Sequence, residues 1–225
     1  MIELHQELEY VDDNVTIWRY MSTEKFLLLM GSQELHFHRV DRFKDNKECT
    51  LSTIDKGLFR YSAESEHYWE NERKRHFINC WIESPCELAL MWDSYGNKGV
   101  AIKSSVKSLR NSFIKDLDHK IYLSRVRYID FDKDSSHIAG APKNILKIVF
   151  TKRKFFNQER EIRLLYSHYD SPRGEEEESY DFKCDIPAMI EEIKLAPNIS
   201  HENEDKIRNF LKREGMLIPI NKSEI

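Results

Sequence analysis

Short runs of apolar residues, many of them alternating with polar ones, predict a chain built largely from strands. The clearest run is V-T-I-W-R-Y-M at residues 15–21, which is rich in β-branched and aromatic side chains. The same reasoning predicts eight further strands. They cover residues 34–40, 76–82, 99–103, 120–131, 159–166, 179–186, 191–197 and 216–220.

Capping residues and helical spacing predict several short helices between these strands. Ser22 or Thr23 can cap a helix that Gly31 would end. The sequence S-P-C-E, with Ser84, Pro85 and Glu87, has the form of a capping box and predicts a helix over residues 85–95. Further helices are expected at residues 64–75, 143–150 and 201–215.

Many short strands with segregated helices indicate an α+β fold. We expect a single domain over residues 1–225, with a mixed or antiparallel β-sheet and short helices on its sides. No internal repeat or linker-like composition divides the chain.

Composition and charge narrow the class of protein. The 35 basic and 39 acidic residues give a net charge of −4, which argues against a protein that coats nucleic acid. No apolar run approaches the roughly 20 residues of a membrane span, and the acidic start does not resemble a signal peptide. The cysteines at 49, 80, 86 and 184 form no C-x-x-C pair and are expected to be buried free thiols. These features predict a cytoplasmic protein that does not contact membranes.

Four segments and the tail resemble a bacterial family, domain of unknown function 2971. The segments are W-R-Y-M-S, E-L-H-F-H-R-V-D-R-F-K-D, C-W-I-E-S-P-C-E-L-A-L-M-W-D-S-Y-G-N-K-G-V-A-I and F-F-N-Q-E-R-E-I-R-L-L. The tail combines I-K-L-A-P, a helix and M-L-I-P-I-N-K-S. The chain departs from the family after Phe43, where Asn-Asp-Pro and then a glutamate are usual. Here Lys44, Asp45 and Asn46 follow, with Glu48 further on, and Ile82 replaces a commoner serine.

The layout also resembles, more weakly, the split β-sheet of ADP-ribosyltransferase-like proteins. An early strand carries an arginine, a short helix follows, and a late strand carries a Glu-x-Glu pattern. This resemblance implies NAD as a substrate, no metal, and a role in phage defence or as a toxin.

Glu161, the second acid of the pair Glu159-x-Glu161, is the candidate catalytic carboxylate. Breaking the nicotinamide–ribose bond builds positive charge on the ribose, which a carboxylate can stabilise. In a regular strand, Glu159, Glu161 and Arg163 share one face. The alternative is that Glu161 pairs with Arg163 or Lys103 on a solvated sheet face.

Arg19, between Trp18 and Tyr20, is the candidate for binding NAD phosphate or ribose, because a guanidinium suits phosphate recognition. A structural Arg–Glu bridge is the alternative. If the resemblance holds, Arg19 and Glu161 should lie within about 10 Å of each other at one pocket.

The remaining candidate NAD contacts are aromatic side chains and Arg163. Trp92 and Tyr95 lie three residues apart on the predicted helix and could form a wall for a nicotinamide or adenine ring. Ordinary core packing is the alternative for both, and also for Tyr20, which faces away from Arg19 in a regular strand.

Two rival functions stay open. One is a non-catalytic module that binds a nucleotide or a protein. The other is a metal-dependent nuclease using Asp41, Asp45, Glu159 and Glu161. Separately, His36 and His38 share one strand face like two ligands of a metal site, but no third ligand stands at a suitable spacing. No metal is therefore expected. The basic runs at residues 73–76 and 151–154 either contact nucleic-acid phosphates or mark a solvated face.

Overall fold

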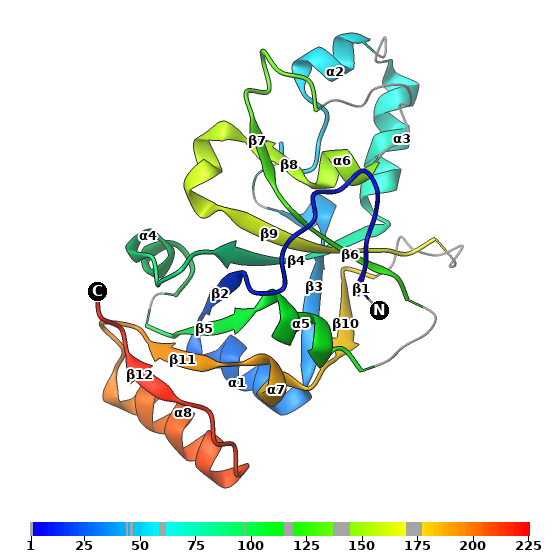
Figure 1. Cartoon of the computed structure of the whole chain (residues 1–225). Coiled ribbons are helices and arrows are strands. Elements are labelled where there is room, and N and C mark those ends of the chain that lie inside the picture. Colours follow the sequence, from blue (N-terminus) through cyan, green and yellow to red (C-terminus); the bar gives the residue numbers. More distant parts are fainter. Residues whose placement is uncertain are drawn as a thin grey trace. The chain divides into compact units, whose positions relative to one another are not determined.

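The structure is a computed structural model, and its fold class is α+β as predicted. Short helices accompany a mixed, largely antiparallel sheet (Figure 1). The structure describes residues 2–43, 45, 47–58, 62–96, 98–114, 119–136, 145–169 and 177–225.

The chain forms two compact units. The first comprises Met1–Val11, His36–Cys80 and Leu117–Tyr180, and the second comprises Asp12–Leu35, Trp81–Asp116 and Asp181–Ile225. Each unit therefore draws on three separate stretches of sequence. The single domain expected over residues 1–225 stays a prediction.

In the first unit, β9 (Glu161–Ser167) pairs antiparallel with β6 (Ile121–Arg125), and β1 (Ile2–Glu3) runs parallel to β6. A second, parallel pair consists of β7 (Arg127–Ile129) and β8 (Thr151–Arg153). The end of β3 (Glu34–Arg39) pairs with the start of β4 (His76–Glu83). The helices of this unit are α2 (Thr53–Leu58), α3 (Ala63–Arg73), α6 (Ile145–Val149) and the 3-10 helices η1 (Val40–Arg42) and η3 (Lys154–Glu159).

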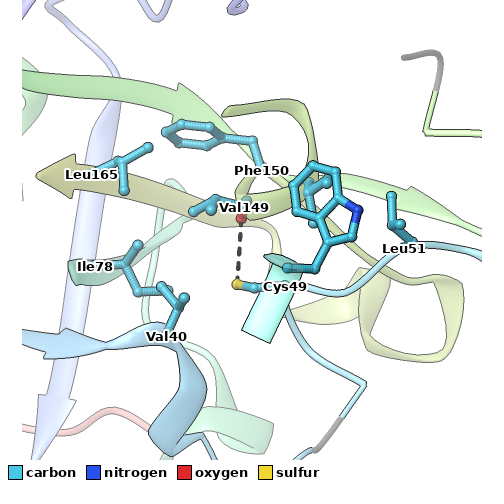
Figure 2. Close-up of a cluster of buried hydrophobic side chains, with 9 residues drawn as sticks. Val40, Cys49, Leu51, Ile78, Val149, Phe150 and Leu165 are labelled. Atoms are coloured by element: carbon cyan, nitrogen blue, oxygen red, sulfur yellow. Dashed lines mark hydrogen bonds between the residues drawn. The ribbon is translucent and has the colours of Figure 1, made fainter. Parts of the chain in front are cut away.

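The core of the first unit collects apolar side chains from helices, strands and a turn segment. Figure 2 shows Ile78 and Leu165 from strands close to Val149 and Cys49. Burial of such a cluster supplies the main driving force for this unit. The buried members are Val40, Cys49, Leu51, Trp69, Ile78, Ile148, Val149, Phe150 and Leu165.

In the second unit, β2 (Thr16–Met21) lies between the end of β4 and β5 (Val100–Ser105), antiparallel to both. β11 (Glu192–Leu195) continues from β5, and β12 (Ile220–Lys222) runs parallel to β11 beside α8 (His201–Arg213; Figure 1). β10 (Ser179–Lys183) enters this unit from the first. The other helices are α1 (Thr23–Ser32), α4 (Ala89–Met91), α5 (Val106–Ser112), α7 (Ile186–Met189) and the π-helix η2 (Trp92–Gly96).

The predicted helix start at Ser22 is confirmed, but the predicted end at Gly31 is wrong. The Ser22 side chain accepts a hydrogen bond from the Lys25 amide. The helix runs on to Gln33, which is left-handed (φ 55°) and whose N–H donates to the Leu29 carbonyl. The Gln33 side chain also donates to Met30 O at 2.6 Å, which holds this ending in place of glycine.

The long helix expected over residues 85–95 is wrong. Only Ala89–Met91 is α-helical, and a π-helix follows it. Tertiary hydrogen bonds outweigh the local capping pattern: Leu88 N donates to the Tyr20 hydroxyl at 2.8 Å. The Glu87 carboxylate accepts bonds from Trp92 Nε1 (2.9 Å) and the Ser223 hydroxyl (2.6 Å), so it does not cap a helix.

Several further element boundaries differ from the sequence pattern, among them the strand expected over 179–186, which ends at Lys183. The strand expected over 120–131 divides at Val126, whose N–H donates to the Glu161 carbonyl at 2.9 Å. The strand expected over 159–166 begins only at Glu161, after Arg160 adopts a left-handed turn (φ 45°). The last strand, expected over 216–220, begins only at Ile220. The Pro219 carbonyl accepts the Ile193 N–H, and this bond is where the pairing with β11 starts. Of the helix expected at 143–150, residues 143–144 lie outside the described part of the chain.

Candidate functional site

A buried cluster of charged side chains lies beside β9 in the first unit. Lys152 comes from β8, Glu159 from the end of η3, and Glu161 and Arg163 from β9. Glu48 joins them from the turn segment before α2. Each of the five residues is at most 8% exposed, so their charges interact in a medium that screens them poorly.

Lys152 joins the two glutamates of the Glu-x-Glu pattern. Its ammonium Nζ lies 2.6 Å from Glu159 Oε2 and 2.6 Å from Glu161 Oε1. The other Glu161 oxygen, Oε2, accepts a bond of 2.7 Å from Arg163 Nε. Both oxygens of the candidate catalytic carboxylate are therefore engaged by cations. The backbone N–H of Glu161 also donates to the Tyr128 hydroxyl at 2.8 Å.

Arg163 is fully buried and uses all three of its nitrogens. Besides Glu161, it donates from NH1 to the Val149 carbonyl at 2.6 Å and from NH2 to the Glu48 carboxylate. The Cys49 sulfur lies 3.6 Å from the same NH1. Such saturation is what a buried guanidinium requires, because an unpaired buried charge is strongly destabilising.

The surroundings of the pair shift the pKa values of its two carboxyl groups in opposite directions. Burial works to raise the pKa of Glu161, but Arg163 and Lys152 hold that pKa well below its usual range. Burial, together with a hydrogen bond to Glu161, raises the pKa of Glu159 to about 7. Below about pH 7 the pair therefore holds one proton, on Glu159, and above that pH both carboxyl groups are ionised. Separated pKa values in two adjoining carboxyl groups are typical of acid–base sites.

The predicted shared strand face is confirmed for Glu161 and Arg163, which form a direct ion pair. It is wrong for Glu159, which ends a 3-10 helix and reaches the cluster through Lys152 instead. The alternative of a solvated face is also wrong, because Glu161 is 6% exposed. Lys103, its other proposed partner, pairs with Glu192 at 4.0 Å in the second unit.

The other candidate NAD contacts belong to the second unit. Arg19 is half-buried on β2, opposite Ile102 of β5. Tyr20 and Trp92 pack edge to face with ring centroids 5.0 Å apart, and burial raises the pKa of Tyr20 to about 12. Tyr95 is 52% exposed. Core packing is thus observed for Tyr20 and Trp92, while binding roles for these residues and the approach of Arg19 to Glu161 stay predictions.

The residues proposed for a metal-dependent nuclease are tied to basic side chains. Asp41 pairs with Arg39 and Asp45 with Arg153, each at 2.7 Å. The rings of His36 and His38 lie 6.2 Å apart. Within the described ranges, no group of three or more histidine, cysteine, aspartate or glutamate residues could hold a metal ion.

The basic run at residues 151–154 does not form one solvated face. Lys152 is buried in the ionic cluster, Arg153 pairs with Asp45, and Lys154 pairs with Asp130 at 2.6 Å. In the run at 73–76, Arg73 donates to the Val40 and Glu48 carbonyls. For Lys152, the prediction of contact with nucleic-acid phosphates and the alternative of a solvated face are therefore both wrong, because Lys152 is buried against carboxylates.

The cysteines, all four of which the structure describes, are free thiols. Burial is confirmed for Cys49 and Cys184, whereas Cys86 is exposed, contrary to expectation. No helix in the described part of the chain has the length and apolar character to cross a membrane.

A family model confirms part of the sequence resemblance. Described as Protein of unknown function (DUF2971), it matches residues 91–164. This range begins at the Met91-Trp92 pair and ends on β9, just after Arg163, so it includes Lys152 and both glutamates of the pair. No curated protein and no solved structure matches the chain.

Sequence reasoning missed Lys152, Glu48 and Tyr128 as members of the cluster. Glu48 had one available signal, since it follows the loop where the resembling family has a glutamate. Lys152 stood within a basic run typical of exposed residues, whereas its burial depends on long-range contacts: β8 pairs with β7, and Lys152 meets Glu161 on β9. Tyr128 reaches the cluster through the backbone of Glu161, which no local pattern indicates.

Proposed function

We propose that the chain is an ADP-ribosyltransferase-like enzyme that uses NAD as its substrate, with the Glu159–Glu161 pair at its catalytic centre. The observation that carries this proposal is a pair of buried carboxyl groups, Glu159 and Glu161, which Lys152 Nζ joins at 2.6 Å from each. It agrees with the Glu-x-Glu resemblance in residue type and spacing.

Each carboxyl group has a distinct role in this reaction. The bond between nicotinamide and ribose C1′ breaks, and both of its electrons leave with nicotinamide as a neutral base. Positive charge develops on the ribose, and the permanently ionised Glu161 stabilises it electrostatically. As this bond breaks, the acceptor oxygen or nitrogen bonds to C1′ and gives its proton to Glu159, whose pKa of about 7 suits a general base at neutral pH.

The engaged state of Glu161 limits how it can act. Lys152 and Arg163 occupy both of its oxygens, so it contributes its charge and not a hydrogen bond to the ribose. Arg163 serves as a positioning residue that fixes this carboxylate. In the same proposal Arg19 binds the phosphate or ribose of NAD, and the exposed Tyr95 contacts one of its rings, while Tyr20 and Trp92 belong to the core. The biological setting we propose is phage defence or toxin action in a bacterial cytoplasm, on a protein or nucleic-acid target.

A second candidate function has its own supporting observation. A carboxylate held by two cations in the interior is also what a structural ion-pair network looks like. In that case the chain is a non-catalytic module that binds a nucleotide or a partner protein.

The experiment that separates these functions is nicotinamide release from NAD, measured alone and with cell extract. Wild type should release nicotinamide, and Glu159→Gln and Glu161→Gln should each lower the rate on the order of a hundredfold. Glu9→Gln is the matched control, because Glu9 pairs with Arg125 on the surface of the same unit. Thermal melts establish that each variant is folded.

NAD binding and nicotinamide release by wild type together distinguish the enzyme from the binding module. Binding of NAD by wild type without turnover would favour the binding module. Absence of both binding and turnover would overturn the use of NAD.

A further inference from the structure

The ionic cluster takes one of its three carboxyl groups from a distant segment of the chain. Among the described residues it has three glutamates, at positions 48, 159 and 161, around Lys152 and Arg163. Lys152, Glu159, Glu161 and Arg163 all lie within one short stretch of the chain, from residue 152 to residue 163. Glu48 comes from a segment 115 residues away from Arg163 in sequence.

Glu48 contacts the two cations in the way that a bound oxyanion would. Its Oε1 accepts from Arg163 NH2 and lies 3.5 Å from Lys152 Nζ. A guanidinium with an ammonium beside it is a common arrangement for recognising phosphate and carboxylate groups. Glu48 is 6% exposed, so its carboxylate closes this position against water.

The backbone that delivers Glu48 is held by side chains, not by a helix or strand. We call residues 47–52 the strap; they are turns and irregular structure between η1 and α2. Arg73 donates to the Glu48 carbonyl at 3.2 Å, and the Cys49 sulfur meets Val149 O at 3.9 Å (Figure 2). Cys49 has φ 54°, a left-handed conformation that costs energy for a non-glycine residue and concentrates at switch regions.

We propose that Lys152 and Arg163 form an oxyanion subsite, and that Glu48 occupies it in the free protein as an internal stand-in for a ligand. A phosphate or carboxylate group takes the place of Glu48, and the strap then moves away from the cluster. This inference rests on the proposed function only in placing a ligand at this cluster, and its test requires no turnover.

Cys49 provides an intrinsic probe of strap movement. Its thiol is 1% exposed in the closed state and becomes accessible when the strap opens. The experiment measures the rate at which N-ethylmaleimide labels Cys49, mapped by peptide mass, in a Cys86→Ser background that removes the exposed thiol. Cys184, which is 1% exposed and belongs to the second unit, reports general unfolding, because it lies outside the strap and the core that the strap joins.

The anion arms are inorganic phosphate and acetate, each compared with chloride at equal ionic strength. Phosphate should accelerate Cys49 labelling roughly tenfold at ten times its dissociation constant, with the labelling of Cys184 unchanged. A response to phosphate alone identifies a phosphate subsite, and a response to acetate as well identifies a general oxyanion subsite. Equal Cys49 rates in phosphate, acetate and chloride would overturn the proposal.

Two variants test whether the Glu48 carboxylate itself holds the strap closed. Glu48→Gln should label rapidly at Cys49 even in chloride, whereas Glu9→Gln should behave as wild type. A folded Glu48→Gln protein that labels at the wild-type rate would contradict the role of the Glu48 carboxylate. Where Glu48→Gln fails to fold, the wild-type anion comparison still decides the question. Acceleration without NAD turnover would support the subsite while refuting the proposed enzyme.

Discussion

Arg163 Nε lies 2.7 Å from Glu161 Oε2, and both side chains are buried two positions apart on β9. The two-residue repeat of the strand places them on one face, and burial makes each dependent on the other. The cluster around them therefore affects both the stability of the first unit and its chemistry.

Replacing Arg163 with methionine should lower the free energy of unfolding by about 3–5 kcal/mol, because the buried Glu161 charge loses its partner. The matched change Arg125→Met removes an exposed pair with Glu9 and should cost at most about 1 kcal/mol. Urea unfolding of the two variants measures the difference. Equal losses would show that the buried pair has no special weight.

His76 should make stability depend on pH. Burial, with a contribution from Arg75, lowers the pKa of His76 to about 3, so the folded protein keeps this ring neutral. The unfolded chain binds a proton below about pH 6.5, and stability therefore falls as pH falls through that value. Between pH 7 and pH 5 the loss from this residue should be about 2 kcal/mol.

The measurement for His76 is the free energy of unfolding against pH for wild type and His76→Gln. The variant loses the hydrogen bond to Ser167 at every pH, so only the slopes are compared. The profile of the variant should be flatter between pH 7 and pH 5. Parallel profiles would mean that His76 is not buried as a neutral ring.

Glu87, and not Ser84, should hold the segment before the π-helix. The Glu87 carboxylate accepts from Trp92, Ser223 and the Glu224 amide, and its loss should cost about 1–3 kcal/mol. The Ser84 hydroxyl accepts only a 3.4 Å bond from the Cys86 amide. Glu87→Ala should therefore lower the melting temperature more than Ser84→Ala does. A larger drop in melting temperature for Ser84→Ala than for Glu87→Ala would contradict this account and support the capping box predicted from the sequence.

Sequence patterns predicted the elements whose residues are fixed by local forces. The run 15–21 forms β2, Ser22 caps α1, and the helix expected at 201–215 forms α8. Gly215 follows α8 with φ +66°, a conformation that glycine adopts without strain.

The patterns failed where distant groups override local preference. Ser84, Pro85 and Glu87 form a good capping box, yet the Tyr20 hydroxyl and the Ser223 side chain bind this segment in another conformation. The pairing of Glu161 with Arg163 followed from strand periodicity, but the burial of both did not, because it depends on Lys152 and Glu48 arriving from other segments. Long-range pairing of this kind leaves no periodic signal in one sequence.

The central claim is that Glu159 is a general base with a pKa near neutrality, and the pH dependence of nicotinamide release tests it most directly. Between pH 5 and pH 9, kcat/KM of wild type should rise about tenfold per pH unit below about pH 7 and then level off, as Glu159 loses its proton. Glu159→Gln, folded by thermal melting, should show a rate lower on the order of a hundredfold with no such rise. A folded Glu159→Gln protein with the wild-type rate and the wild-type pH profile would contradict the claim.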